Sequence, residues 1–200
     1  MFRIISGRWK GKRIAAPKHF EVRPTTDFAK EALFSILEHR HDIEFLTVLD
    51  LFAGIGSISL EFASRDCKDI TAVEMNPKHC AFINATAADL DMALQINVQR
   101  ADVYEYLKKN RSKKQFDLVF CDAPFESTDE AHYQKLIDLV LNGDFLKPGG
   151  TFVLEHTTRL KLRHPAILEN RKYGNITFSF LHKPETEVES DALETPVIEA

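Results

Sequence analysis

The sequence between Thr47 and His156 repeats one pattern, in which a short apolar run is followed by a segment with helical spacing. The strand-like runs cover residues 47–52, 69–75, 96–102, 115–122 and 151–156. Strands that are joined by helices pair in parallel, and their right-handed crossovers place helices on both faces of the sheet. We therefore predict an α/β fold with a mostly parallel sheet between two layers of helices.

The segments on either side of this pattern predict further elements. Two strand-like runs around Arg8–Gly11 predict a small N-terminal β-hairpin, and helical spacing from Asp27 to about Arg40 predicts a helix with a threonine N-cap. Residues 166–174 and 175–182 predict two strands joined around Gly174-Asn175, which makes the last strand antiparallel. The LKPGG run before the final parallel strand predicts a turn.

Charge divides the chain into three parts. Residues 1–23 carry seven Lys or Arg residues against Glu21 alone, whereas residues 184–200 carry six acids and no Lys or Arg. An acidic segment without aromatic residues cannot bury enough apolar surface to fold. We predict a basic N-terminal β-hairpin extension over residues 1–24, a globular domain over 25–183 and a disordered acidic tail over 184–200.

Several classes of protein are disfavoured by the sequence. It holds no run of about 18 uncharged apolar residues and no signal-peptide pattern, which predicts a cytoplasmic protein without a membrane span. Cys67, Cys80 and Cys121 form no CxxC pair, and the eight histidines form no HExxH motif. We expect no disulfide framework, no metal site and a monomer. Strand alternation directs Cys121 away from the face of its neighbour Asp122, so we assign it no catalytic role.

A glycine-rich turn, LDLFAGIGSIS, follows the first strand of the pattern and opens a helix. No GKS or GKT follows it, which disfavours nucleoside triphosphate hydrolysis. Glu74 lies 20 residues after Gly54, the spacing at which an acid binds ribose hydroxyls. Asp50, Glu74 and Asp102 would line one crevice, and such acids suit S-adenosylmethionine better than the pyrophosphate of NAD. Each acid alone could instead cap a helix or lie in a solvated turn.

The run FDLVFCDAPF ends a strand in a carboxylate, a proline and an aromatic ring. Ligands of open α/β sheets bind beyond the carboxyl ends of strands, so we predict a catalytic site made of Asp122, Ala123, Pro124 and Phe125. Asp122 and the backbone carbonyls beside it could accept hydrogen bonds from a planar amine. Phe125 could stack on the base that carries this amine. The alternative is that Phe125 is a core residue and Asp122 caps the next segment.

These motifs together resemble a known family. DLFAGIG, VEMNP, RAD and DAPF are similar to motifs of class I methyltransferases, which have a Rossmann-like sheet, and RIISGRWKGKRI and RPTTDFAKEALFSIL resemble the opening of the RsmD family. Members of that family methylate the guanine N2 amine of small-subunit (16S) ribosomal RNA. The resemblance, which covers roughly residues 2–182, implies S-adenosylmethionine as cofactor. It implies ribosomal RNA or an assembling small ribosomal subunit as partner.

The resemblance also implies roles for individual residues. The methionine end of the cofactor would be lined by Asp50, Phe52, Ala53, Gly54 and Gly56. Its ribose would be bound by Glu74 and its adenine amine by Asp102, while the adenine ring would be flanked by Met75 and Val103. RNA contacts are predicted for the basic N-terminal segment and the RPTT junction, namely Arg3, Arg8, Lys10, Lys12, Arg13, Arg23 and Thr25.

One position departs from the motif of amine methylases. These enzymes usually read NPPY or DPPF, and Ala123 stands here in place of the first proline. That proline would restrain Asp122, so we expect a looser turn but retained activity. Three alternatives stay open, namely methylation of adenine N6, methylation of a glutamine side-chain amide, and a catalytically silent RNA-binding factor.

Overall fold

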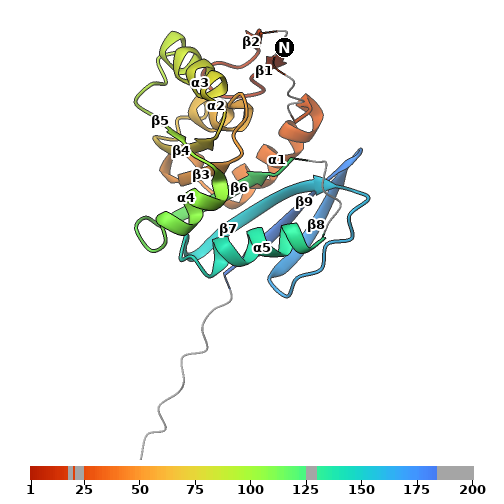
Figure 1. Cartoon of the computed structure of the whole chain (residues 1–200). Coiled ribbons are helices and arrows are strands. Elements are labelled where there is room, and N and C mark those ends of the chain that lie inside the picture. The colour runs from red at the N-terminus through yellow and green to blue at the C-terminus, as the bar shows by residue number, and fades with distance from the viewer. Residues whose placement is uncertain (18–19, 21–24, 125–129, 184–200) are drawn as a thin grey trace, which may run out of the picture.

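The computed structural model describes residues 1–17, 20, 25–124 and 130–183. Its centre is a seven-stranded sheet with the strand order β5-β4-β3-β6-β7-β9-β8 (Figure 1). The strands are β3 (Thr47–Leu51), β4 (Asp69–Glu74), β5 (Ile96–Arg100), β6 (Phe116–Asp122), β7 (Leu146–Thr157), β8 (Ile167–Tyr173) and β9 (Ile176–His182). Within this sheet β9 runs antiparallel to both neighbours, while the pairs formed by β3 to β7 are parallel. The predicted α/β sheet with an antiparallel last strand is confirmed.

Helices cover both faces of the sheet. They are α1 (Asp27–Arg40), α2 (Ser57–Ser64), α3 (Pro77–Asp89), α4 (Val103–Lys109) and α5 (Glu130–Leu141), with a 3₁₀ turn, η1, at Ile43–Phe45. Local sequence signals begin two of them. The Thr26 hydroxyl accepts a hydrogen bond from Ala29 N (3.2 Å) at the start of α1, and the Asn76 side chain accepts one from Lys78 N (2.9 Å) ahead of Pro77 in α3.

Two hydrophobic cores lie on opposite faces of the sheet. One core joins alternate residues of the central strands to α1, α2 and α3, as Phe120 illustrates, and the other joins the remaining alternate residues to α4 and α5, as Cys121 illustrates. Figure 1 shows α4 and α5 together on one side of the strands. Cys121 is fully buried in the second core, which confirms that it faces away from the side of Asp122.

The N-terminal hairpin consists of β1 (Phe2–Arg3) and β2 (Arg13–Ile14), which pair antiparallel. Its apolar side chains are buried in the first core, and the ammonium group of the fully buried Lys30 donates to Arg3 O (2.6 Å) and Glu61 Oε1 (3.0 Å). The hairpin therefore packs into the core of the main domain. The predicted boundary at residue 24 and the predicted acidic tail lie outside the described residues.

The LKPGG segment corrects one prediction. It lies inside β7, where Phe116 of β6 pairs with Leu146 and Leu118 pairs with Thr151, so that β7 carries extra residues between the two pairs. A Cβ atom at Gly150 would lie 2.9 Å from Lys147 O, which requires glycine at this close approach of two backbones. The predicted turn is therefore an irregularity within a long strand.

Two absences hold for the part of the chain that the structure describes. None of its helices is long and apolar enough to cross a bilayer. None of its His, Cys, Asp and Glu side chains form a group of three or more that could bind a metal ion.

Candidate active site at the carboxyl ends of the strands

Acidic side chains gather at one edge of the sheet because parallel strands end there together. Asp50 lies near the end of β3 and Glu74 ends β4, while Asp102 follows β5. Asp122 ends β6, and strand register places it directly beside Glu155 of β7. The structure thus places the predicted acids of four strands at the same edge and adds a fifth acid, Glu155.

The glycine-rich turn between β3 and α2 has an unusual backbone. Phe52, Gly54 and Gly56 have φ angles of 59°, 56° and 77°, in the left-handed region that a phenylalanine rarely adopts. A Cβ atom at Gly56 would lie 2.9 Å from Ile83 Cγ1 of α3. The turn is therefore held close to its neighbouring helix, and Gly56 forms the N-cap of α2.

Glu74 holds this turn to the start of α3. Its Oε2 accepts a hydrogen bond from Gly54 N (2.9 Å), and its Oε1 accepts one from Asn76 N (2.7 Å). The two sequence motifs that predict cofactor contacts, DLFAGIG and VEMNP, therefore meet at one carboxylate. Met75 beside it is 64% exposed, which leaves its apolar side chain open to a ligand.

The other predicted cofactor residues have local roles as well. Asp102 Oδ1 accepts a hydrogen bond from Glu105 N (3.0 Å) and caps α4, which is the alternative that the sequence left open. Val103 is buried in the second core. Asp50 is 1% exposed and accepts a hydrogen bond from Ser59 Oγ (2.5 Å), and burial raises its pKa to about 7. Ala53 N bonds to Val73 O (3.0 Å), which fixes the turn to β4.

Asp122 and Glu155 form an adjoining pair of acids whose pKa values are both raised. Burial raises the pKa of Asp122 well above its usual range, and the nearby Glu155 and Asp50 raise it further. Burial also raises the pKa of Glu155 to about 7. Two neighbouring buried carboxyls ionise together only at high cost, so the pair retains a proton near neutral pH. Asp122 Oδ1 is shielded from solvent and has no hydrogen-bond partner among the described residues.

Thr25 contacts Glu155 of this pair and does not lie on an exposed surface. It is 8% exposed, and its hydroxyl donates a hydrogen bond to Glu155 Oε2 (2.9 Å). Its burial does not fit the direct RNA contact that the sequence predicted. Glu155 itself was missed, although the TFVLEH run carries an acid one residue before its end.

The two residues that follow Asp122 in the DAPF motif differ in burial. Ala123 is fully buried in the second core, Pro124 is exposed, and Phe125 lies outside the described residues. Tyr133 of α5 is fully buried, and its hydroxyl likewise has no partner among the described residues. Burial raises its pKa to about 12, with contributions from Cys121 and Asp122, so it stays a neutral donor.

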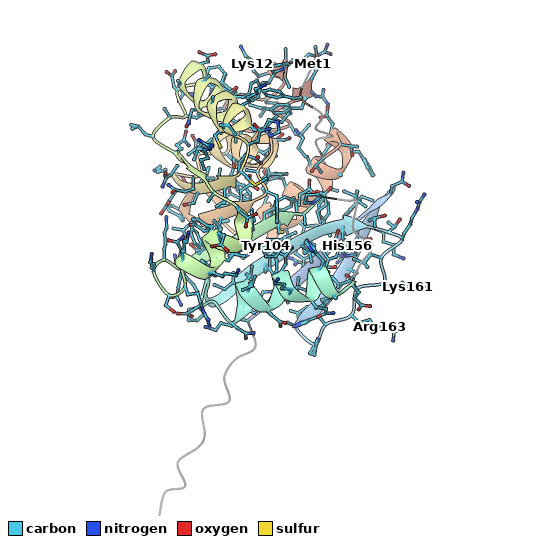
Figure 2. The ribbon with its side chains drawn as sticks, viewed as in Figure 1. Met1, Lys12, Tyr104, His156, Lys161 and Arg163 are labelled. Atoms are coloured by element: carbon cyan, nitrogen blue, oxygen red, sulfur yellow. The ribbon has the colours of Figure 1, made fainter. Side chains whose placement is uncertain are left out.

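The predicted RNA-binding cations lie on the N-terminal segment, at the opposite end of the molecule from the loop that carries Lys161 and Arg163 (Figure 2). Arg3 pairs with Asp27 (3.1 Å), and Arg8 lies 3.8 Å from Asp91. Three more are exposed and have no ion pair with a described residue, namely Lys10, Lys12 and Arg13. Arg23 lies outside the described residues.

Residues 2–182 match the family described as Conserved hypothetical protein 95. The Ribosomal RNA small subunit methyltransferase D of Haemophilus influenzae is 29% identical over 189 residues, which cover 86% of this chain and 93% of that protein. The structure of a putative methylase from Haemophilus influenzae superposes with a TM-score of 0.72 at 26% identity, over 91% of this chain and 98% of that one.

A second solved structure is more distant in sequence. It is an RNA methyltransferase from Salinibacter ruber in complex with S-adenosyl-L-homocysteine, with a TM-score of 0.62 at 18% identity over 84% of this chain and 97% of that one. At this identity the likeness concerns the fold.

Proposed function

The chain belongs to the family described as Conserved hypothetical protein 95, which includes RsmD-type methyltransferases, and on this premise we propose that it methylates RNA. The reaction would transfer a methyl group from S-adenosylmethionine to the exocyclic N2 amine of a guanine in small-subunit ribosomal RNA. The observation that carries this proposal is the unpartnered, shielded Asp122 Oδ1 beside Glu155, at the strand edge that also holds the glycine-rich turn.

The cofactor fits the chemistry of this edge. S-adenosylmethionine supplies an electrophilic methyl group on a sulfonium and carries an ammonium as well. A bound cation favours ionised carboxylates, and the burial that raises the pKa of Asp50 makes such a ligand more favourable there than a neutral one. The glycine-rich turn would admit its methionine end, Glu74 would bind its ribose and Asp102 its adenine amine.

Asp122 would position and polarise the amine. A guanine amine is a weak nucleophile because its lone pair is delocalised into the ring. A carboxylate oxygen without a partner can accept a hydrogen bond from that amine, and this bond strengthens as positive charge develops on nitrogen. The bound cofactor would supply the methyl group with its thioether as the leaving group, and the methylated amine would then lose one proton. A carboxyl pair with raised pKa values is suited to accept it.

The exposed cations of the N-terminal segment favour RNA over a protein amide as the substrate. Adenine N6 presents the same planar amine as guanine N2, so the choice between the two bases rests on the resemblance to the RsmD family. The silent RNA-binding factor is disfavoured because such a protein has no use for a strained pair of buried acids.

The test is to incubate the protein with methyl-labelled cofactor and small ribosomal subunits from cells that lack it, and to identify the labelled nucleotide. We expect label on guanine N2. Label on adenine or on a ribosomal protein would refute the substrate assignment, and cofactor binding without transfer would favour the silent binder.

Substitution of Asp122 distinguishes a role in methyl transfer from a structural role. We expect Asp122→Ala to slow transfer by about 100-fold or more, as for the loss of one transition-state hydrogen bond. Cofactor affinity, measured by calorimetry, should stay unchanged. Asp122→Asn keeps one acceptor oxygen and should retain more activity than Asp122→Ala. Equal loss of cofactor binding and transfer in Asp122→Ala would assign the residue a structural role.

A further inference from the structure

A second basic surface, which we call the basic strip, lies in the loop between β7 and β8. It consists of Arg159, Lys161 and Arg163, which are exposed, and it alternates with Leu160 and Leu162, which are 8% and 7% exposed. The two leucines pack in the second core. The leucines are buried while the three cations between and beside them are exposed, so the charged side chains face outward.

Backbone hydrogen bonds fix the strip in place. Leu160 N bonds to Thr157 O (3.1 Å) at its start. At its end, Gln134 Nε2 of α5 donates to Arg163 O (2.5 Å), and Arg163 N donates to Glu130 Oε1 (3.3 Å). The Glu130 carboxylate is therefore engaged by a backbone amide. The strip is attached to α5 through its main chain and its leucines, which leaves the charged ends of its side chains free.

The three strip cations lack the ion pairs that nearby arginines form. Arg171 lies 2.9 Å from Glu169, and Arg40 pairs with the same carboxylate. None of the three strip cations forms an ion pair with a residue in the described part of the chain. A fixed row of like charges without counter-charges attracts a polyanion.

The strip also lies at the edge of the sheet that carries the candidate active site. It follows directly on β7, whose Glu155 faces Asp122. At the same edge Thr158 N donates to Asn175 O (3.0 Å) in the β8–β9 turn. In Figure 2, Lys161 and Arg163 project from one side of the molecule and Lys12 lies at the other end, with His156 between them. The strip and Lys12 thus lie on different sides of His156, which is the neighbour of Glu155 in β7.

We propose that the basic strip binds the phosphate backbone of the substrate RNA, opposite the contacts of the N-terminal segment. This inference rests on the proposed RNA methyltransferase function and extends it with a second contact surface. Cations that neutralise phosphates position an RNA without reading its sequence. RNA held on both sides of the acids would present one base to Asp122.

RNA is favoured over an anionic membrane by the direction of the leucines. A segment that binds a bilayer surface presents apolar side chains to it together with its cations. Here Leu160 and Leu162 point into the protein and only charged side chains point outward. The strip offers charge to a ligand and nothing that would insert into lipid.

The experiment uses the full chain with Arg159→Gln, Lys161→Gln and Arg163→Gln combined, which keeps both leucines. The probe is full-length small-subunit ribosomal RNA transcribed in vitro, and the dissociation constant is measured over a series of KCl concentrations. Each lost phosphate contact lowers the slope of log affinity against log salt by about 0.7, so we expect the slope to fall by about 2 and affinity at low salt to fall about tenfold or more.

A matched control removes the same charge from the opposite edge of the sheet. Lys108→Gln, Lys109→Gln and Lys113→Gln combined change exposed cations at and beyond the carboxyl end of α4. If this control weakens binding as much as the strip variant, the proposal is overturned, because only total charge then matters. Calorimetry with S-adenosylhomocysteine checks that both variants fold, and unchanged cofactor affinity is expected.

Two further outcomes separate the proposals. If the strip contributes to RNA binding but labelled methyl groups appear on adenine or protein, the substrate assignment fails and the strip proposal stands. If methyl transfer to guanine N2 occurs and the strip variant binds RNA as the unmodified protein does, the strip proposal alone fails. Binding of the unmodified protein to phosphatidylserine vesicles through the strip, without strip-dependent RNA binding, would likewise overturn it.

Discussion

The two halves of the acidic edge differ in how their carboxylates are satisfied. On the β4 side, Glu74 accepts hydrogen bonds from two backbone amides, and Asp102 beyond β5 caps a helix. On the β6 and β7 side, Asp122 and Glu155 adjoin each other with raised pKa values, and Asp122 Oδ1 has no partner among the described residues. The acids of the first half have hydrogen-bond partners within the chain, whereas the second half leaves one carboxyl oxygen without a partner among the described residues.

Under the proposed function, the Glu74 half would bind the cofactor and the Asp122 half would carry out methyl transfer. Backbone amides around Glu74 preorganise the glycine-rich turn, so a cofactor would meet a site that is already formed. The strained pair of carboxyls costs folding free energy, which natural proteins commonly accept at the position where chemistry occurs. Each of the following experiments changes one of the two halves.

The largest effect is expected for the pH dependence of the free energy of unfolding, to which the Asp122 half contributes through Glu155. Glu155 has a folded pKa near 7, raised above its unfolded value, so its contribution is present at low pH and is lost as pH rises through about 7. The free energy of unfolding should therefore decrease between pH 5 and pH 8.5, with a contribution from Glu155 on the order of 3 kcal/mol.

Urea unfolding at the two pH values measures this effect in the unmodified protein, Glu155→Gln and Glu74→Gln. Glu155→Gln should make the pH dependence shallower because the glutamine cannot ionise, and the remaining slope comes from Asp50 and Asp122. Glu74→Gln is the matched control from the other half, because it also removes a carboxyl but leaves the Asp122–Glu155 pair in place. Parallel pH profiles for all three proteins would contradict the contrast between the halves.

An intermediate effect is expected when the Glu74 half is changed. Glu74→Gln removes a charged acceptor of Gly54 N and Asn76 N, and hydrogen bonds to charged groups contribute about 1.5 kcal/mol or more. We expect cofactor affinity, measured by calorimetry, to fall about tenfold or more. Glu105→Gln, on the exposed side of α4, is the control and should change it little. An unchanged affinity in Glu74→Gln would mean that the acid does not bind the ribose.

The smallest effect is expected at the position that departs from the motif. Ala123 is fully buried, so Ala123→Pro adds atoms to a packed core and should lower stability by about 1 kcal/mol. We expect the rate of methyl transfer to change less than tenfold, because the backbone carbonyls beside Asp122 remain. A gain of 100-fold would show that the missing proline limits the unmodified protein.

Much of the fold follows from local patterns. The alternation of strands and helices, the caps at Thr26 and Asn76 and the opposite orientation of Cys121 were all predictable, because each depends on residues a few positions apart. The bulge at LKPGG was not, because it depends on how β7 pairs with a strand that precedes it by about 30 residues. The burial of Lys30 could not be predicted either, since its partner Glu61 lies on another helix.

The candidate site likewise combines features that local sequence predicts with features that depend on contacts between distant segments. By itself the sequence determined which strands end in acids and where a glycine-rich turn must lie, since motif spacing and strand period are properties of the chain. Only the tertiary structure decided that Glu155 lies beside Asp122. It also brings the Thr25 hydroxyl into hydrogen-bond contact with Glu155, which is 130 residues away in the sequence. The ionisation of a carboxyl depends on its burial and on nearby charges, and both arise only when distant segments pack together.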